Sequence, residues 1–345
     1  MSERDRGRAG WSEPAAPMWR RRLITGPGFV LAALVAVPLS PAVTILAALW
    51  DLLRRRPFTA TRFVLALTGV LVMHVVGLAG LAAIWLLGGG WRGRPSAREL
   101  SWEYGFEAWW AHAVWRLAAR IYAIRLVIEG DEVAATGPFL LLSRHVSLLD
   151  TLLPIAILTV RHGRRLRFVM KRELLWDPCL DALGHRVPTA FVHRGGRDHA
   201  GDLAAVEALL EGLGEPDAIA LYPEGTRFSP AKRDQVLGSL ARRHPHLHQR
   251  AARLRHVLPP HPGGPLGLLV HRPDLDVVFC AHVGLEGANR FGDLLAGALI
   301  GRTVHVHYRR LPAAEVPREP EACLDWLYER WAEVDDWVDA HREPA

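Results

Sequence analysis

The sequence predicts an α/β fold in which helices flank a mixed β-sheet, preceded by an N-terminal transmembrane or re-entrant helical hairpin. Two observations support this prediction. From about residue 124 onward, short apolar runs typical of strands alternate with segments that have a helical pattern. Before that point, residues 26–50 and 63–91 contain no charged residue. Each of these two runs exceeds the ~20 residues with which a helix crosses a bilayer.

The first 91 residues divide into a tail and a hairpin. Residues 1–24 are rich in Ser, Glu, Arg, Gly and Pro, and we expect a disordered tail. Residues 25–91 form the predicted membrane hairpin, in which Pro38 and Pro41 could kink the first helix or make it re-entrant. A cleaved signal peptide fits less well, because the first run is longer than the ~7–15 apolar residues of such a signal and a second run follows it at once.

Tryptophans and arginines border the two apolar runs. Trp19, Trp50, Trp85 and Trp91 stand at the ends of the runs, as in the aromatic belt of a membrane protein. The flanking arginines number six outside the hairpin and four within its loop. Because the more basic side of a membrane protein faces the cytoplasm, we predict a protein of the cell (cytoplasmic) membrane with its C-terminal α/β domain, residues 124–345, on the cytoplasmic side.

Residues 92–123 link the hairpin to the predicted α/β domain. Six aromatic residues lie between positions 102 and 115, and helical spacing brings several of them onto one face. This pattern suits an amphipathic helix that lies in the membrane interface. A helix packed on the α/β domain explains the same pattern equally well.

The elements of residues 124–345 follow from local patterns. Strands are predicted at 124–128, 139–143, 167–170, 187–192, 218–222, 276–280 and 303–308, and helices at 147–160, 200–213 and 321–341. A segment of roughly 220 residues lies within the upper range of a single domain.

The composition excludes several classes of protein. Of the 345 residues, 50% are hydrophobic and 23% are charged, which excludes a disordered chain. The formal net charge of +6 favours an anionic partner, such as a phosphorylated substrate, a membrane surface or nucleic acid. The three cysteines form no C-x-x-C pair, a pattern typical of a reducing compartment rather than of a disulfide framework.

A candidate general base follows the strand at 139–143. His145 and Asp150 are separated by four residues, and a carboxylate at this distance can hold one ring nitrogen protonated while the other accepts a proton. Context favours this pair, because ligands bind at the carboxyl ends of strands in open α/β sheets. The spacing alone is a weak signal, since it recurs in two other pairs, His193/Asp198 and His271/Asp276.

Two further strand ends carry groups that suit a phosphate. The strand at 218–222 runs into Pro223-Glu-Gly-Thr-Arg227, where glycine allows close backbone approach and arginine offers a bidentate fork. The strand at 187–192 runs into His193 and Arg194. The three strand ends could therefore meet at one substrate that carries a phosphate next to a hydroxyl group.

These segments resemble the sequence blocks of the glycerolipid acyltransferase family, which includes the 1-acylglycerol-3-phosphate acyltransferases. Four blocks occur in the family's order: His145–Asp150, Phe191–Arg194, Pro223–Arg227 and Val257–Pro260. Further details are similar to the subgroup that includes lysocardiolipin-type enzymes: Phe228, the run from His256 with Gly263 and Gly264 beyond it, Val304–Arg310 and Trp326-Leu327. The resemblance covers residues 124–340.

The resemblance implies a role for each matched residue. His145 would be the general base that deprotonates the acceptor hydroxyl, and Asp150 would orient it and stabilise its charge. The fourth block would help to bind the acyl donor, and the hydroxyl would attack a thioester directly, without an acyl-enzyme. The acceptor phosphate would be bound by Arg194, Glu224, Gly225, Thr226 and Arg227.

The chain departs from the family pattern at two places. Arg144 precedes the base where Asn is commoner, and Pro260-His-Pro262 stands where related enzymes often have a basic residue after the proline. Both departures bear on the identity of the acceptor more than on the type of reaction.

We therefore predict a membrane-bound O-acyltransferase that converts 1-acylglycerol-3-phosphate to phosphatidic acid. The co-substrate would be acyl-CoA or acyl-carrier protein, and we expect no cofactor and no metal. The expected partners are the thioester donor, the lysophospholipid acceptor and the bilayer, and not nucleic acid. Two alternatives stay open: an acyltransferase for another lysolipid or glycolipid, and a basic membrane-anchored module without enzymatic activity that binds anionic lipid or nucleic acid.

Two other readings have weaker support from the sequence. A serine hydrolase lacks the G-x-S-x-G elbow. A metal site at His244-Pro-His-Leu-His248 lacks neighbouring cysteines or carboxylates, and arginines surround it.

Overall fold

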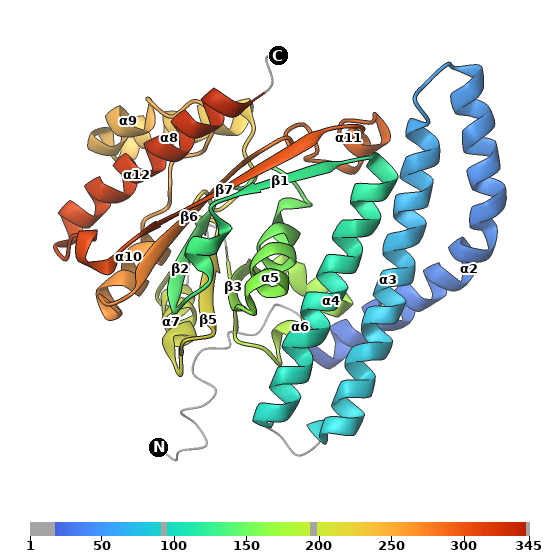
Figure 1. The fold of residues 1–345 in the computed structure, drawn as a ribbon, viewed down its shortest axis with the longest axis horizontal. Helices are drawn as coiled ribbons and strands as arrows, with labels where there is room; N and C mark the ends of the chain where they lie inside the picture. Colours follow the sequence, from blue (N-terminus) through green and yellow to red (C-terminus); the bar gives the residue numbers. More distant parts are fainter. Residues whose placement is uncertain (1–17, 91–94, 194–198, 343–345) are drawn as a thin grey trace. The chain divides into compact units, whose positions relative to one another are not determined.

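The computed structural model describes residues 18–90, 95–193 and 199–342 (Figure 1). Its contacts divide the chain into two compact units. Unit 1 comprises residues 1–124, 167–209 and 291–301, and unit 2 comprises residues 125–166, 210–290 and 302–345, each as far as the structure describes them. The tail predicted at 1–24 lies mostly outside the described residues. The domain boundaries drawn from the sequence stay predictions.

Unit 1 contains the N-terminal helices. α2 (Met18–Leu53), α3 (Thr59–Gly88) and α4 (Ala97–Tyr122) are its long elements. β3 and β4 pair in parallel, with Phe168 opposite Thr189. The shorter elements of this part of the chain are β3 (Arg165–Lys171), η5 (Arg172–Trp176), α6 (Pro178–Gly184), β4 (Thr189–Val192), α7 (His199–Glu207), η6 (Ala208–Leu210) and α11 (Phe291–Leu295).

α2 and α3 correspond to the two apolar runs. Each is long and apolar enough to cross a membrane, and few of its residues are buried. α2 is a single helix that passes through Pro27, Pro38 and Pro41 and bends along its length (Figure 1). Proline removes a backbone donor and so bends a helix without necessarily ending it. Two such helices fit the predicted association with a membrane.

Asp51, in the last turn of α2, joins the two helices of the hairpin. Its carboxylate accepts hydrogen bonds from the backbone N–H groups of Ala60 at 3.2 Å and Thr61 at 2.8 Å, and from the hydroxyl of Thr61 at 2.8 Å. The first N–H groups of a helix have no partner within that helix. Asp51 therefore caps the start of α3 and fixes the turn between α2 and α3.

α4 packs against α3 and carries a buried acidic stripe. Gly69 and Gly80 of α3 leave room for Leu117 and Phe106 of α4, because a Cβ atom at either glycine would overlap these side chains. On α4 itself, the buried acids recur every four residues. Arg186 pairs with the first two of them, Glu99 (2.7 Å) and Glu103. An interfacial position for the outer face of α4 stays a prediction.

Glu107, the third acid of this stripe, makes the stability of unit 1 depend on pH. Burial raises its pKa from 4.5 to about 8. A buried acid with a raised pKa stabilises the fold fully below pH 4.5, and that contribution is lost as the pH rises through about 8. Relative to wild type, we expect Glu107→Gln to gain about 1–3 kcal/mol of stability at pH 8.5, since one pKa unit corresponds to about 1.4 kcal/mol.

Thermal unfolding of the two proteins in detergent at pH 4 and pH 8.5 would measure this difference. The measurement at pH 4 is the internal control, because below pH 4.5 the glutamate is protonated in both the folded and the unfolded protein and is neutral, as glutamine is. An equal shift at both pH values would contradict the prediction.

Unit 2 is built on five strands in the order β1-β7-β6-β2-β5. β1/β7, β6/β2 and β2/β5 are parallel pairs, and β7 runs antiparallel to β6. Every residue of β2 and β5 is buried, as in a sheet covered on both faces. The strands are β1 (Arg125–Glu129), β2 (Phe139–Ser143), β5 (Asp217–Leu221), β6 (Asp276–Val283) and β7 (Thr303–Leu311). The predicted mixed sheet with flanking helices is confirmed.

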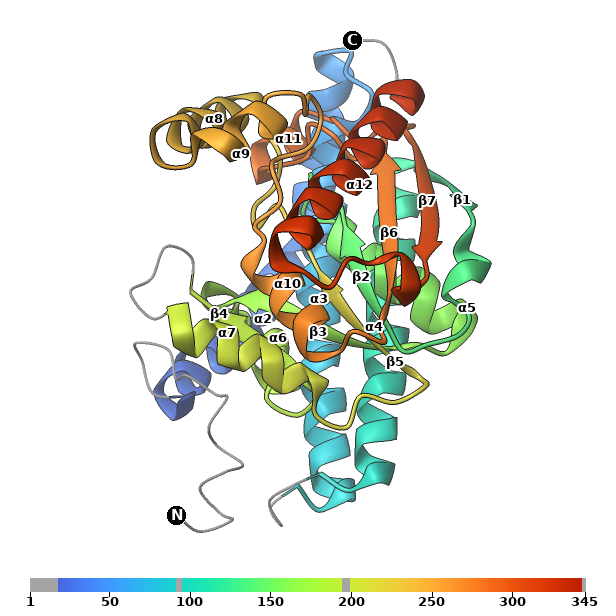
Figure 2. The same ribbon diagram turned by 90° about the vertical axis from the view of Figure 1, so that its left-hand side faces the viewer.

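The helices of unit 2 lie around this sheet. α12 lies along β6 (Figure 2), and α8 and α9 pack their leucines on Tyr328 of α12. The longer helices are α8 (Pro230–Arg243), α9 (Pro245–Ala251), α10 (Gly263–His271) and α12 (Pro320–His341). The short turns are η2 (Asp131–Ala134), η3 (Asp150–Leu152), the π-helical η4 (Ile155–Thr159), α5 (Val160–His162) and η7 (Ala313–Glu315).

The helix predicted at 147–160 differs from the observed structure. Its first residues are not helical, and the rest is divided among η3, η4 and α5. Asp150 accepts the backbone N–H groups of Val146 and Ser147, which holds the chain in a turn. Pro154, just before η4, has no N–H with which to continue a regular helix. The predicted helical segment is therefore present from residue 150 to residue 162, but it begins three residues later than expected and is not a regular α-helix.

Candidate active site

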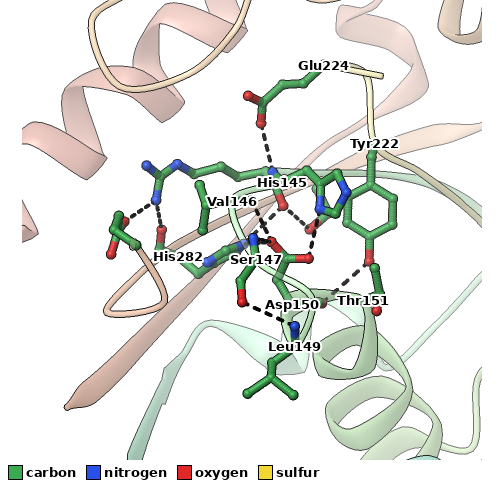
Figure 3. A network of polar contacts seen from close by, with 12 residues as sticks. His145, Val146, Ser147, Leu149, Asp150, Thr151, Tyr222, Glu224 and His282 are labelled. Atoms are coloured by element: carbon green, nitrogen blue, oxygen red, sulfur yellow. Dashed lines mark hydrogen bonds and ion pairs between the residues drawn. The ribbon is translucent and has the colours of Figure 1, made fainter. Parts of the chain in front are cut away.

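His145 and Asp150 form a hydrogen-bonded pair at the carboxyl edge of the sheet. Nδ1 of His145 lies 2.8 Å from Oδ1 of Asp150, and the other carboxylate oxygen accepts N–H groups from Val146 at 2.5 Å and Ser147 at 2.7 Å (Figure 3). A carboxylate only accepts, so Nδ1 carries the proton. Among the residues that the structure describes, none pairs with Nε2. Its lone pair can therefore accept a proton from a substrate.

The surroundings of Asp150 keep it ionised. Complete burial by itself raises its pKa, but the charge and hydrogen bond of His145, with smaller contributions from His282 and the Val146 N–H, outweigh burial and hold the pKa below 3.8. His282 is also fully buried, with Nε2 at 3.8 Å from Asp150 and 3.0 Å from the Arg144 carbonyl, to which it donates. Burial lowers the pKa of His282, so the pair has a neutral neighbour.

Tyr222 covers one side of the His145 ring. The two ring centroids lie 4.8 Å apart with 43° between the planes (Figure 3). The Tyr222 hydroxyl donates to the Asp150 carbonyl at 3.5 Å. Burial, and then the nearby Asp150, raise the pKa of Tyr222 well above 10, so the hydroxyl stays protonated. Tyr222 thus restricts the ring to the orientation that keeps Nδ1 on Asp150.

The turn from 223 to 228 holds the backbone of His145 from both sides. Glu224 accepts the His145 N–H at 2.7 Å, and the N–H of Phe228 donates to the His145 carbonyl at 2.7 Å. The second carboxylate oxygen of Glu224 accepts the N–H of Leu258 at 2.8 Å. Burial raises the pKa of Glu224 to about 8, against the opposing effect of these N–H groups and Arg144.

The structure gives Glu224 an anchoring role in addition to the one expected from the sequence. Its side chain is buried, and each of its carboxylate oxygens accepts a backbone N–H group. Glu224 thereby anchors the segment that carries the candidate base. Its part in an acceptor phosphate site stays a prediction.

Thr226 and Arg227 lie at the outer part of the same turn. Gly225 has φ +62°, a left-handed conformation that favours glycine. Arg227 donates to the Asn289 carbonyl at 2.7 Å. Lys232 places its Nζ 2.9 Å from the Thr226 hydroxyl and 3.2 Å from the Arg227 carbonyl. Arg227 and Lys232 thus place two positive charges next to the Thr226 hydroxyl, and an anion site would require such a grouping.

Lys232 was not singled out from the sequence, whereas Arg194 was. Lys232 is one of only two lysines in the chain, and it lies in the first turn of α8, where Ser229 is the N-cap. Ser229 and Pro230, which follow the turn directly, are a typical signal for the start of a helix, and this signal could have located Lys232 in the first turn. Arg194 lies outside the described residues.

Arg144, the residue at which the chain departs from the family pattern, is fully buried. Its guanidinium donates to the carbonyls of His282 at 2.5 Å and His256 at 2.9 Å, and pairs with Glu286 at 2.5 Å. Arg144 therefore fastens the end of β2 to two other segments next to the His145–Asp150 pair.

Two alternative kinds of site gain no support from the geometry. The hydroxyl of Ser147 is buried, donates to the Ala288 carbonyl and accepts the Leu149 N–H, each at 3.2 Å, so it is not directed at His145. Within the described residues, one group could hold a metal ion, namely His74, Asp177 and Cys179. Its histidine and carboxylate already pair at 2.8 Å, and Asp177 also caps α6.

A mixed α/β sheet with a histidine–carboxylate pair at its carboxyl edge supplies the groups that general base chemistry on a hydroxyl group requires. Sequence comparison is more specific. Residues 125–263 match the family described as Acyltransferase, and residues 293–344 match the family described as Acyltransferase C-terminus. The two segments together cover more than half of the chain. The chain belongs to the acyltransferase family.

Individual relatives are distant. The mouse 1-acyl-sn-glycerol-3-phosphate acyltransferase epsilon is 24% identical over 221 residues, which are 60% of this chain and 59% of the mouse protein. An uncharacterized acyltransferase of Schizosaccharomyces pombe is 45% identical over 38 residues, or 11% of each chain. The chain thus spans less than two thirds of the length of these relatives. The crystal structure of the 1-acyl-sn-glycerophosphate acyltransferase of Thermotoga maritima matches with a TM-score of 0.46 and 13% identity, over 79% of this chain and 97% of that chain.

Proposed function

We propose that this protein transfers a fatty acyl group from a thioester, acyl-CoA or acyl-carrier protein, to the free hydroxyl of a lysophospholipid. The proposed acceptor is 1-acylglycerol-3-phosphate, and the product is phosphatidic acid. The observation that carries the proposal is the His145–Asp150 pair, in which Nδ1 is hydrogen-bonded to a buried carboxylate at 2.8 Å, while Nε2 has no partner among the described residues.

The chemistry follows from this pair. Nε2 of His145 accepts the proton of the hydroxyl as its oxygen attacks the thioester carbonyl, and Asp150 stabilises the imidazolium that forms. When the tetrahedral intermediate collapses, the carbon–sulfur bond breaks and the imidazolium returns the proton to the leaving thiolate. The products are an ester and a free thiol, and His145 is regenerated.

The acceptor phosphate would bind at the turn that holds Thr226 and Arg227. A guanidinium has five N–H donors in a fork that suits a phosphate, and Arg227 uses one of them on Asn289. Lys232 adds a second cation beside Thr226. An acceptor and a product that reside in a bilayer also suit a chain with two long apolar helices. The arginine distribution supports a site on the cytoplasmic side of the cell membrane.

The proposal is tested with the full chain in proteoliposomes. A panel of lysophospholipids with different headgroups is offered together with acyl-CoA or acyl-carrier protein, and the products are identified by mass spectrometry. We expect 1-acylglycerol-3-phosphate to be acylated with the highest kcat/KM. If the wild type acylates none of these lipids with either donor, the proposed function is wrong.

Two variants test the residues. His145→Ala should lower kcat by about 10²–10⁴-fold, the range for removal of a general base. Arg227→Ala should raise the acceptor KM with little change in kcat. His271→Ala is the matched control, because it has the same spacing to an aspartate but donates to the Gly267 carbonyl. A His145→Ala protein with wild-type kcat would exclude the assigned base.

A further inference from the structure

The C-terminal helix α12 holds a loop that lies next to the active site. Asp335 of α12 is buried, with 2% of its surface exposed. Its carboxylate accepts three consecutive backbone N–H groups, those of Arg255 at 2.9 Å, His256 at 2.6 Å and Val257 at 3.0 Å. A buried N–H that loses its acceptor costs about 1–3 kcal/mol, so this single carboxylate fixes the loop strongly.

Trp331, one turn earlier on α12, holds the next residue of the loop. Its indole N–H donates to the Leu258 carbonyl at 3.0 Å, and its fully buried ring lies 6.4 Å from that of Phe279 in β6. The loop from 255 to 258 is therefore attached to α12 at four successive residues.

The other side of the loop is attached to the base. The N–H of Leu258 donates to one oxygen of Glu224 at 2.8 Å, and the other oxygen of Glu224 accepts the N–H of His145 at 2.7 Å. Arg144 adds a second link, because it donates to the His256 carbonyl at 2.9 Å. Asp335 is thus connected to the backbone of His145 in three steps: by hydrogen bonds to the loop, along the loop backbone to Leu258, and by the two hydrogen bonds of Glu224.

We propose that Asp335 is a positioning residue for His145: it fixes the loop, the loop orients the Glu224 carboxylate, and Glu224 sets the backbone of the base. The inference rests on the proposed function for its catalytic consequence. Asp335 lies in residues 293–344, the segment that matches the C-terminal family. This segment would therefore support a site whose residues lie within 125–263, the segment that matches the Acyltransferase family. A misplacement of about 1 Å can lower a rate about 10²-fold, so a remote anchor of this kind can be decisive.

Kinetics of three variants of the full chain in proteoliposomes test the proposal. Asp335→Leu removes the acceptor and should lower kcat by about 10–100-fold, with the acceptor KM within about threefold of wild type. Asp335→Asn keeps an oxygen at the position that accepts all three N–H groups and should retain most of the rate. Asp336→Leu is the control, because this neighbouring side chain is 77% exposed.

A double-mutant cycle separates positioning from general destabilisation. If Asp335 acts through Glu224, then Asp335→Leu in a Glu224→Gln background should lower kcat much less than it does alone. If the two effects multiply, the proposal is overturned. Trp331→Phe, which removes the indole donor together with one ring of the indole, is the milder test should Asp335→Leu fail to fold, and it should lower kcat by about 3–10-fold. A Trp331→Phe protein with wild-type kcat would also overturn the proposal.

Hydrogen exchange provides a readout that needs no activity. By mass spectrometry, the peptide that contains His145 and Val146 should exchange faster in Asp335→Leu than in wild type or Asp336→Leu. Unchanged exchange in Asp335→Leu would overturn the proposal even if the protein is an acyltransferase. Faster exchange in Asp335→Leu, together with a wild type that has no acyltransferase activity, would instead count against the proposed function alone.

Discussion

Asp150→Asn is expected to lower kcat/KM by about 10⁴-fold while the fold is retained. The two backbone N–H groups of Val146 and Ser147 point at one oxygen of Asp150, so the amide oxygen of an asparagine must take that place. Its NH₂ group then faces Nδ1 of His145. Because this group donates, Nδ1 must accept, and the ring proton moves to Nε2. A ring protonated at Nε2 cannot accept the proton of the substrate.

The comparison with Asp150→Ala makes this argument specific. If Asp150 only supplied negative charge, asparagine and alanine would impair kcat/KM to the same extent. A tautomer held in the wrong state predicts that asparagine impairs kcat/KM more than alanine does. Steady-state kinetics of both variants would measure this, with circular dichroism as the check on folding. An Asp150→Asn enzyme within tenfold of wild type would refute the assigned tautomer.

Asp181→Ala is expected to lower the free energy of unfolding by about 3–5 kcal/mol, the range for removing one partner of a buried ion pair. Asp181 and Arg21 are both fully buried, with nitrogen and oxygen 2.6 Å apart. Burial raises the pKa of Asp181, but hydrogen bonds from His185, Arg21 and Arg22 outweigh it and lower the pKa to about 2. The stabilisation by this carboxylate is therefore present above pH 3.8 and is lost as the pH falls through about 2.

Thermal or denaturant unfolding in detergent at pH 7 would measure the loss. Asp234→Ala is the control, since Asp234 is 76% exposed and exposed ion pairs contribute only about 0–1 kcal/mol. The double variant Arg21→Met/Asp181→Leu should recover much of the stability, because it leaves no buried charge behind. A loss below 1 kcal/mol in Asp181→Ala would show that water reaches this pair.

The strand pattern and the His145–Asp150 pair were predictable because both depend on residues close in the sequence. β2 and β5 are short apolar runs that are buried throughout, and such runs are recognisable without a structure. His145 and Asp150 are five positions apart and follow one of these strands directly. Their hydrogen bond confirms the predicted pairing, whereas the role of His145 as base stays a prediction.

The environment of the pair was not predictable, because it depends on residues far apart in the chain. Glu224 joins His145 to Leu258, and Asp335 joins α12 to the loop before it. The sequence of residues 223–227 does not tell that its glutamate anchors two distant backbone segments, because His145 and Leu258 are far from it in the chain. The acids of α4 are a similar case, because nothing near them in the sequence indicates their partner Arg186.

The hydrogen bonds around His145 also constrain how the protein is made. The base is synthesised early, but the carboxylate of Asp335, which anchors its surroundings, comes 190 residues later. A nascent chain that already contains all four sequence blocks still lacks α12, and so it cannot form the bonds from residues 331 and 335 to the 255–258 loop. The order of translation thus places the completion of this site after the synthesis of residue 335, and later than the synthesis of the two apolar helices.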